Sequence, residues 1–403
     1  MNILFVTENE ISQQLGGTER ITITLSDEFT RLGHTCYLAF CKRSDHPDIC
    51  SFRQTLLLDE HRAQEQLCEL LQRESIDIVV SNLVGISYKR RLLPILYAAT
   101  RGTKARVVGC YHAMPGEDLL GNRIDNSLYR IRRGGSLTAN LKDIALTILG
   151  PRMVRRIFRR SITRKYRLMD DYSDRIVLHT PEACRQYAQI AWLPFDGRFA
   201  AVNSALSYDT FLDEAALAGK ARVVLIVARL DEKPKRISFA LKAWKAILQD
   251  GRFSSWQLKI VGGGPDEAYY RRMARRLGLK NVSFEGRVAD LTAYYREASI
   301  FLLTSAFEGW ALTLTESQQF GVVPVALDSY VSLPTIITDH ETGLIVPDGD
   351  MKAFVAAVRS LMADDALRER IARSGLVSCR RFTVDKIARD WLALFEDMLS
   401  RQS

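Results

Sequence analysis

Short apolar runs that alternate with stretches of helical spacing constrain the fold of this chain more than any other feature. The chain opens on the run NILFVT, followed by a glycine-containing loop and then by Ile21, Leu25, Phe29 and Leu32 at helical spacing. The runs CYLAF, IDIVVSN and ARVVGCYH continue this order. Strands that alternate with helices predict a parallel, doubly wound α/β sheet.

A second series with the same alternation starts at ARVVLIVARL. Because a single hydrophobic core stops growing near ~250–300 residues, the 403 residues suit two Rossmann-like α/β domains. We expect an N-terminal domain over residues 1–205, with a basic, mostly helical insertion over about 119–170. A C-terminal domain is expected over 206–380, and residues 381–403 are expected to form a helix that packs across the domain junction.

The composition is that of an average globular protein, with 47% hydrophobic and 26% charged residues. The apolar runs are much shorter than the ~20 residues that a membrane-spanning helix needs, and the N-terminus lacks the basic region and cleavage site of a signal peptide. A cytoplasmic location is therefore expected. The seven cysteines include no C-x-x-C pair, which favours reduced thiols over a disulfide framework or a zinc site.

The formal net charge of +9 predicts attraction to an anionic partner. The strongest basic run, GPRMVRRIFRRSITRKYR, places Arg155, Arg156, Arg159 and Arg160 so that pairs share a helical face beside apolar residues. Such a stretch suits peripheral contact with anionic lipid at the inner face of a membrane. A solvated helix face explains it equally well, so both interpretations stay open. No nucleic-acid-binding module is recognisable, and nucleic acid is not expected as a partner.

The segment with the most candidate functional residues is SAFEGWALTLTE, which places Glu308 and Glu316 after the apolar run SIFLLT and at the start of a helix. The N-terminus of a helix has unpaired N–H groups and the positive end of the helix dipole, so it attracts an anion such as a diphosphate. Gly309 allows a ligand to approach the backbone closely. Two glutamates on an exposed helix end remain the simpler alternative.

The longer stretch SAFEGWALTLTESQQFGVVPVAL resembles the glutamate-pair motif of glycosyltransferase family 4, and the resemblance covers nearly the whole chain. It implies the GT-B fold, in which two Rossmann-like domains face each other across a cleft, and a retaining nucleotide-sugar transferase. The resemblance implies that Glu308 binds the donor sugar and that Glu316 binds the ribose. It also places in the donor site the residues between them at the helix start, which are Gly309, Trp310, Ala311 and Leu312.

Two cationic residues of the segment VARLDEKPKRI follow the apolar run VVLIVA, which is the first predicted strand of the C-terminal domain. Arg229 and Lys235 lie where open α/β sheets bind ligands, beyond the carboxyl end of a strand. By the resemblance they neutralise the departing diphosphate, with Lys233 as a rival to Lys235. A solvated basic helix start is the alternative.

Five further residues join the candidate site mainly through the resemblance. Gly16 and Gly17 of LGGTER would lie against the diphosphate, although a tight turn without a ligand also explains them. His112 ends the run RVVGCYH and would contact the donor sugar near the reacting centre, although a lone histidine is often structural. Gly263 and Val288 are assigned to the donor cleft on weaker similarity.

Two motifs that could indicate other cofactors are better explained without one. The D-x-D in VPDGDMKAF places Asp350 as an ordinary N-cap rather than as a metal ligand. The run VGGGPDE lacks the third glycine of a dinucleotide fingerprint. We therefore expect no cofactor and no metal, and assign charge neutralisation to the arginine and lysine.

Together these features predict a retaining, metal-independent, hexosyltransferase-type enzyme that uses a nucleotide-sugar, with a UDP-sugar favoured. The acceptor would be a hydroxyl of a glycan or lipid-linked oligosaccharide in bacterial surface polysaccharide synthesis, whether lipopolysaccharide, capsule or exopolysaccharide. The alternatives are a GT-B-fold sugar-nucleotide epimerase and a non-catalytic glycan-binding subunit.

Overall fold

The computed structural model describes residues 1–12, 16–44, 52–82, 89–117, 148 and 159–400. The chain divides into two compact units. The first unit contains Met1–Ala205 together with Val384–Ser403, and the second contains Leu206–Thr383. Most of the basic insertion lies outside the described residues, but residues 159–171 are helical. Within the part of the chain described, no helix is long and apolar enough to cross a membrane.

The first unit is built on a parallel sheet of seven strands in the order β3-β2-β1-β4-β5-β6-β7. Ile3 of β1 pairs with Cys36 of β2 on one side and with Ile78 of β4 on the other. The strands are β1 (Asn2–Asn9), β2 (Thr35–Lys42), β3 (Gln54–Leu57), β4 (Ile78–Ser81), β5 (Arg106–Cys110), β6 (Arg175–Leu178) and β7 (Phe199–Ala201).

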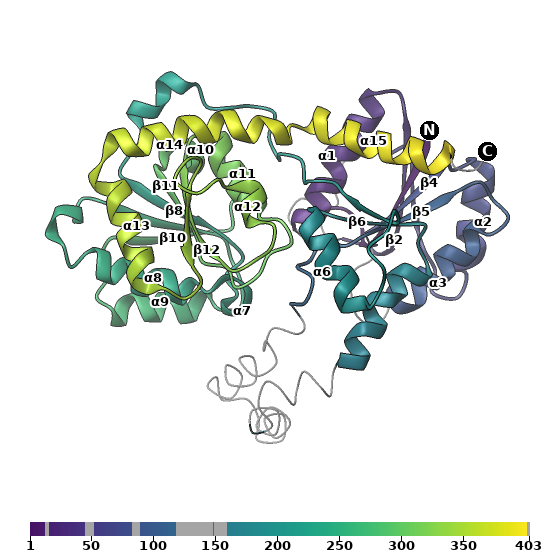
Figure 1. The fold of residues 1–403 in the computed structure, drawn as a ribbon, viewed down its shortest axis with the longest axis horizontal. Coiled ribbons are helices and arrows are strands. Elements are labelled where there is room, and N and C mark those ends of the chain that lie inside the picture. The colour runs from purple at the N-terminus through teal and green to yellow at the C-terminus, as the bar shows by residue number, and fades with distance from the viewer. Residues whose placement is uncertain (13–15, 45–51, 83–88, 118–147, 149–158, 401–403) are drawn as a thin grey trace. The chain divides into compact units, whose positions relative to one another are not determined.

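Helices cover both faces of this sheet (Figure 1). The helices are α1 (Gly17–Arg31), α2 (Ala63–Arg73), α3 (Lys89–Thr100), α6 (Pro181–Ala191) and α15 (Val384–Ser400). Side chains of β1 alternate between two cores: Phe5 packs with residues of α1 and α15, and Leu4 packs with residues of α2 and α3. A strand buried on both faces reads as a continuous apolar run, which explains NILFV.

The second unit is built on a parallel sheet of six strands in the order β10-β9-β8-β11-β12-β13. These are β8 (Val223–Val227), β9 (Gln257–Val261), β10 (Val282–Gly286), β11 (Ile300–Leu303), β12 (Val323–Asp328) and β13 (Leu344–Pro347). The order reverses between β8 and β11, which pair through Val224 and Ile300. In doubly wound sheets ligands bind outside the carboxyl ends of the strands at such a reversal.

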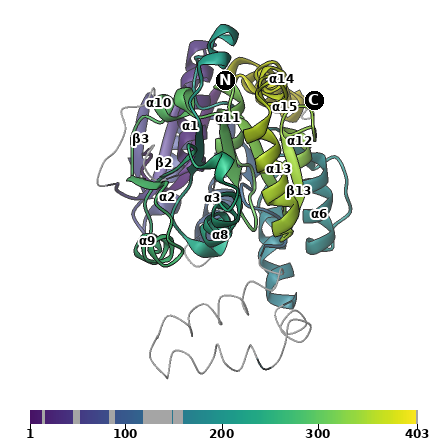
Figure 2. The ribbon, with the colours of Figure 1, turned by 90° about the vertical axis from the view of Figure 1, so that its left-hand side faces the viewer.

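Helices pack on both sides of the second sheet, and Figure 2 shows α8 and α13 side by side. Phe239 and Phe354 join these two helices edge to face at 5.4 Å between ring centres. The helical segments are η1 (Glu214–Gly219), α7 (Glu232–Lys235), α8 (Ile237–Ile247), η2 (Gly251–Phe253), α9 (Glu267–Arg276), α10 (Thr292–Glu297), α11 (Leu312–Gln319), α12 (Leu333–Ile336), α13 (Met351–Ala363), α14 (Asp365–Ser378) and η3 (Cys379–Phe382). The prediction of two Rossmann-like α/β domains is confirmed.

Candidate active site

The candidate site of the second unit lies at the carboxyl ends of β8 and β11, where the strand order reverses. Arg229 follows β8, and Lys235 ends the short helix α7 in the same connection. Glu308 lies in the loop after β11, which leads to α11. Because β8 and β11 are neighbours in the sheet, these two connections meet although they are about seventy residues apart in the sequence.

Lys235 and Glu308 form a direct ion pair. The Lys235 ammonium donates to Oε1 of Glu308 at 2.5 Å, and the Ser305 hydroxyl donates to the same oxygen at 2.6 Å. The two charged side chains retain 22% and 14% of their exposure, so they are shielded but reachable. Lys233 differs, because it is exposed and its ammonium lies 5.9 Å from the centre of the Phe307 ring. The structure thus brings Lys235, and not Lys233, into contact with Glu308.

Glu316 lies within α11 and is completely buried. The hydroxyl of Tyr295, also fully buried, donates to its Oε2 at 2.8 Å. Tyr295 is held in place by Phe320, whose ring stacks on it at 5.8 Å. Burying a carboxylate costs free energy unless hydrogen bonds satisfy it, and Tyr295 supplies one of them. The sequence does not single out Tyr295, because neither of the two adjacent tyrosines of α10, Tyr294 and Tyr295, belongs to a motif.

At the start of α11, backbone groups rather than polar side chains are available to a ligand. Ala311 is the N-cap and supplies no capping hydrogen bond from its side chain, and the first turn holds no acidic residue. Trp310 and Leu312 are buried, and the Trp310 ring packs edge to face against Phe382 at 5.1 Å. The Ser332 hydroxyl donates to the Gly309 carbonyl and fixes the loop. A helix start with no acidic side chain suits an anionic ligand.

Arg229 is exposed, with 64% of its side chain accessible, and it donates to Asp231 at 3.0 Å. Its loop is bonded to the glycine run of the next connection, since Leu230 N donates to Gly263 O at 3.0 Å. A Cβ on Gly264 would lie 2.5 Å from the Leu230 carbonyl oxygen, and one on Gly263 would lie 2.9 Å from the flexible side chain of Arg287. VGGGPDE therefore supports the Arg229 loop.

Arg236 holds together the loops that carry the site, a role that the sequence did not indicate. Its guanidinium donates to the carbonyls of Thr304 and Ser305, both at 2.8 Å, and to Asp348 at 2.6 Å. Asp350 accepts from Ala353 N at 2.9 Å, so its predicted N-cap role is confirmed. Among the described residues no group of three or more His, Cys, Asp or Glu could hold a metal ion.

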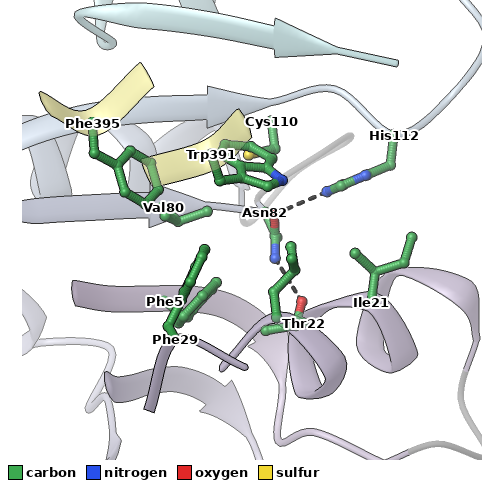
Figure 3. A pocket seen from close by; sticks show the side chains of 11 residues that line it. Phe5, Ile21, Thr22, Phe29, Val80, Asn82, Cys110, His112, Trp391 and Phe395 are labelled. Atoms are coloured by element: carbon green, nitrogen blue, oxygen red, sulfur yellow. Dashed lines mark hydrogen bonds between the residues drawn. The ribbon is translucent and has the colours of Figure 1, made fainter. Parts of the chain in front are cut away.

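In the first unit, His112 lies just beyond β5 and forms a hydrogen-bonded chain with two residues from other elements (Figure 3). His112 Nε2 and Asn82 Oδ1 are 2.9 Å apart, and Asn82 Nδ2 donates to the Thr22 hydroxyl oxygen at 2.8 Å. Burial lowers the pKa of His112 to about 4, so the ring is neutral at pH 7. The ring of His179, whose pKa burial lowers to about 3, lies 5.4 Å away.

The glycine pair of the first unit opens α1. Gly16 is its N-cap and Gly17 its first residue, and no side chain caps the helix at Gly16. The φ of Gly16 is 168°, which is extended backbone that any residue adopts, so conformation alone does not require glycine there. Val288, in the second unit, follows β10 and is partly buried. The donor contacts of Gly16, Gly17, Gly263 and Val288 remain predictions.

The basic run of the predicted insertion is described only in part. Arg155 and Arg156 lie outside the described part, whereas Arg159 and Arg160 are exposed.

The six cysteines within the described ranges are free thiols, and burial raises the pKa of Cys184 to about 11.

Comparison with known proteins defines the class to which the second unit corresponds. Residues 208–376 match the family model of glycosyl transferases group 1. This match contains Arg229, Lys235, Glu308 and Glu316. The family match and the named glycosyltransferase relatives support a transferase enzyme.

The curated relatives match about half of this chain. An exopolysaccharide phosphotransferase of Streptomyces coelicolor is 30% identical over 207 residues, which are 51% of this chain and 21% of that protein. A phosphatidyl-myo-inositol mannosyltransferase of Mycobacterium leprae is 29% identical over 208 residues, 50% of this chain and 54% of that one. An α-1,4-N-acetyl-D-galactosaminyltransferase of Campylobacter jejuni, named for a PP-undecaprenol-linked glycan, is 28% identical over 179 residues, 44% and 49% of the two chains. The chain thus spans about half the length of these relatives or less.

Solved structures of glycosyltransferases share the fold over the whole chain. The lipopolysaccharide outer core galactosyltransferase WaaB has a TM-score of 0.66 at 16% identity, covering 98% of this chain and all of the other. Anabaena HepE in complex with UDP-glucose has a TM-score of 0.68 at 14% identity, with full coverage of both chains. At such low identity these structures show the fold alone, which is the two-domain GT-B fold.

Proposed function

We propose that this chain is a retaining, metal-independent glycosyltransferase of family 4 that moves a sugar from a nucleotide-sugar, with a UDP-sugar favoured, to a hydroxyl of a glycan or lipid-linked oligosaccharide. The observation that carries the proposal is the Lys235–Glu308 ion pair, together with the exposed Arg229 of the same connection as Lys235, at the strand-order reversal of the unit that matches the group 1 family. Relatives that act in exopolysaccharide and lipid-linked glycan synthesis support the acceptor class.

The chemistry that these residues can perform follows from their charges. As the bond between the anomeric carbon and the diphosphate oxygen breaks, the departing diphosphate gains negative charge, and Arg229 and Lys235 stabilise it. The acceptor oxygen bonds to the anomeric carbon on the same face, and its proton passes to the leaving phosphate oxygen. Glu308 accepts a hydrogen bond from a donor-sugar hydroxyl once Lys235 turns to the diphosphate, and Glu316 binds the ribose.

Nucleotide release from a panel of UDP-, GDP- and ADP-sugars, with lipid-linked and free glycan acceptors, tests this proposal. We expect turnover with one donor class, undiminished by chelator, and a product of unchanged anomeric configuration by NMR. A sugar-nucleotide epimerase would instead convert the donor without an acceptor, and a glycan-binding subunit would release no nucleotide. Chelator-sensitive transfer would contradict the metal-independent mechanism.

We also propose that this protein binds an anionic membrane surface and meets its acceptor there. The guanidinium of Arg159 lies 4.6 Å from the ring centre of Trp192, which is 61% exposed, and Arg185 lies 5.5 Å from that of Phe195, which is 51% exposed. Exposed aromatic rings next to arginines suit the interfacial region of a bilayer. Arg160 adds charge to the same helical segment.

Vesicle flotation measures this contact directly. The protein should bind vesicles that contain phosphatidylglycerol more than neutral vesicles, and W192S/F195S should lower the bound fraction several-fold. R252S, which removes an exposed arginine from the second unit, is the control. Equal binding to neutral and anionic vesicles would contradict the proposal.

A further inference from the structure

The hydrogen bonds between α1, β4 and β5 have directions that follow from the donors and acceptors available. The Thr22 hydroxyl donates to the carbonyl of Thr18 at 2.8 Å, within α1. Its single hydrogen is therefore used, and its oxygen can only accept from Asn82. Asn82 consequently presents its NH₂ group to Thr22 and its carbonyl oxygen to His112.

This orientation of Asn82 decides which nitrogen of His112 carries the proton. An amide oxygen only accepts hydrogen bonds, so Nε2 of His112 must be the donor across the 2.9 Å contact. In the neutral ring the other nitrogen, Nδ1, is then unprotonated. Nδ1 is buried and has no hydrogen-bond partner among the described residues. A buried acceptor left unpaired costs free energy, so a ligand hydroxyl that donates to Nδ1 would be bound favourably.

Apolar side chains protect the chain of hydrogen bonds from water on one side. Asn82, Thr22 and His112 line a cavity of about 20 Å³ together with Phe5, Phe29 and Trp391 (Figure 3). Such a cavity has room for about one water molecule. Because most of the lining side chains are apolar, the cavity offers few other hydrogen-bonding groups that could turn the Asn82 amide.

We propose that Thr22 and Asn82 are positioning residues that hold His112 as its Nε2–H tautomer, so that Nδ1 is a fixed acceptor for a hydroxyl of the bound ligand. The assignment of that hydroxyl to the donor sugar rests on the proposed function. The tautomer itself does not, because it follows from the hydrogen bonds of the free protein. The opposite arrangement would require Thr22 to leave Thr18 and donate to Asn82, with His112 then protonated on Nδ1.

Nitrogen NMR of the full-length protein labelled with ¹⁵N-histidine distinguishes the two tautomers. The chain has six histidines, and the signal that disappears in H112Q identifies His112. We expect Nδ1 of His112 to show the shift of an unprotonated nitrogen and Nε2 that of a protonated one at pH 7. A protonated Nδ1 in the wild-type protein would overturn the proposal.

Variants of the two positioning residues separate their role from general stability. T22V frees the Asn82 amide to turn and should give a mixture of His112 tautomers, whereas T22S restores the single form. T24V is the matched control, since the Thr24 hydroxyl makes the same bond within α1, to the Arg20 carbonyl at 3.0 Å. A single Nε2–H form in T22V would overturn the role of Thr22.

N82D tests the contact with His112 by charge. A carboxylate next to Nε2 stabilises the protonated ring, so the pKa of His112 should rise by about 1–3 units. Among the described residues, titratable groups beside His112 include His179, from the end of β6, and Cys110 in the same cavity wall. Neither changes in N82D, so an unmoved pKa of His112 would overturn the role of Asn82.

Donor kinetics then connect the tautomer to the proposed reaction. T22V should lower kcat/KM for the nucleotide-sugar about two- to tenfold, which corresponds to one neutral hydrogen bond, whereas T24V should match the wild-type protein. The expected tautomer without nucleotide release from any donor would contradict the proposed function alone. Transfer by a protein whose His112 is protonated on Nδ1 would contradict this inference alone.

Discussion

At the residue scale, Glu308 and Lys235 form an ion pair with each other in the free protein. Lys235 and the Ser305 hydroxyl both donate to one carboxylate oxygen of Glu308. In the proposed reaction the lysine binds the diphosphate and the glutamate binds the sugar. Donor binding must therefore break an existing ion pair, and the two residues should respond differently to a nucleotide that carries no sugar.

UDP binding measured by calorimetry should separate the two residues. K235Q should weaken binding roughly ten- to two-hundredfold, because a charge-assisted hydrogen bond to phosphate contributes about 1.5–3 kcal/mol. E308Q should bind UDP at least as tightly as the wild-type protein, since Lys235 loses its competing carboxylate, while sugar transfer falls. K233Q is the matched control and should bind UDP normally. A larger loss in K233Q than in K235Q would assign the diphosphate to Lys233.

At the element scale, the connection after β8 is positioned by the connection after β9. Leu230 N donates to Gly263 O, and Asp266 N donates to Leu230 O at 2.9 Å. Asp266 also accepts from Glu232 N at 2.8 Å, which fixes the start of α7. Arg229 and Lys235 thus depend on a glycine loop that need not touch the donor itself.

A methyl group on Gly264 should disturb this loop. In G264A the new Cβ would begin 2.5 Å from the Leu230 carbonyl oxygen, so the Arg229 loop must shift at a cost of about 1–3 kcal/mol. We expect lower thermal stability of the second unit and UDP binding weakened at least several-fold. In G251A the added Cβ meets nothing within 4 Å, and this variant should behave as wild type. Unchanged UDP binding by a folded G264A would show that the loop is not needed.

At the scale of the whole molecule, the two ends of the described chain share one core. Helix α15 belongs to the first unit, and its residues Trp391 and Phe395 pack with Phe5 of β1 and Phe29 of α1. Phe395 is completely buried, and its ring meets that of Phe29 at 5.9 Å. The last helix therefore stabilises the unit that holds His112.

The variant F395A should lower the stability of the first unit by about 3–5 kcal/mol, the usual cost of removing a buried phenylalanine ring. Hydrogen exchange followed by mass spectrometry should show faster exchange in β1, β4 and α1. The second unit should keep its exchange rates, because α15 is not part of it. E396A, at an exposed position of the same helix, is the control. Equal loss of protection in both units would contradict this division.

The sequence by itself determined the fold class and marked the charged candidates for the site, with Lys233 and Lys235 left as alternatives. Runs that are apolar on both faces and alternate with helical spacing permit little other than parallel α/β sheets, and Glu308, Glu316, Arg229 and Lys235 lie in the segments that follow such runs. These signals are local in the sequence. The motif also predicts that an anion binds at the start of α11.

Only the tertiary structure decided which residues hold the site in place. Asn82 meets Thr22 sixty residues away and His112 thirty residues away, and Tyr295 meets Glu316 across two elements. It also chose Lys235 over Lys233 as the partner of Glu308, although both lysines lie in the same short helix. The physical reason is that a hydrogen bond depends on distance and direction in space, and the sheet brings together the ends of strands that no local pattern connects.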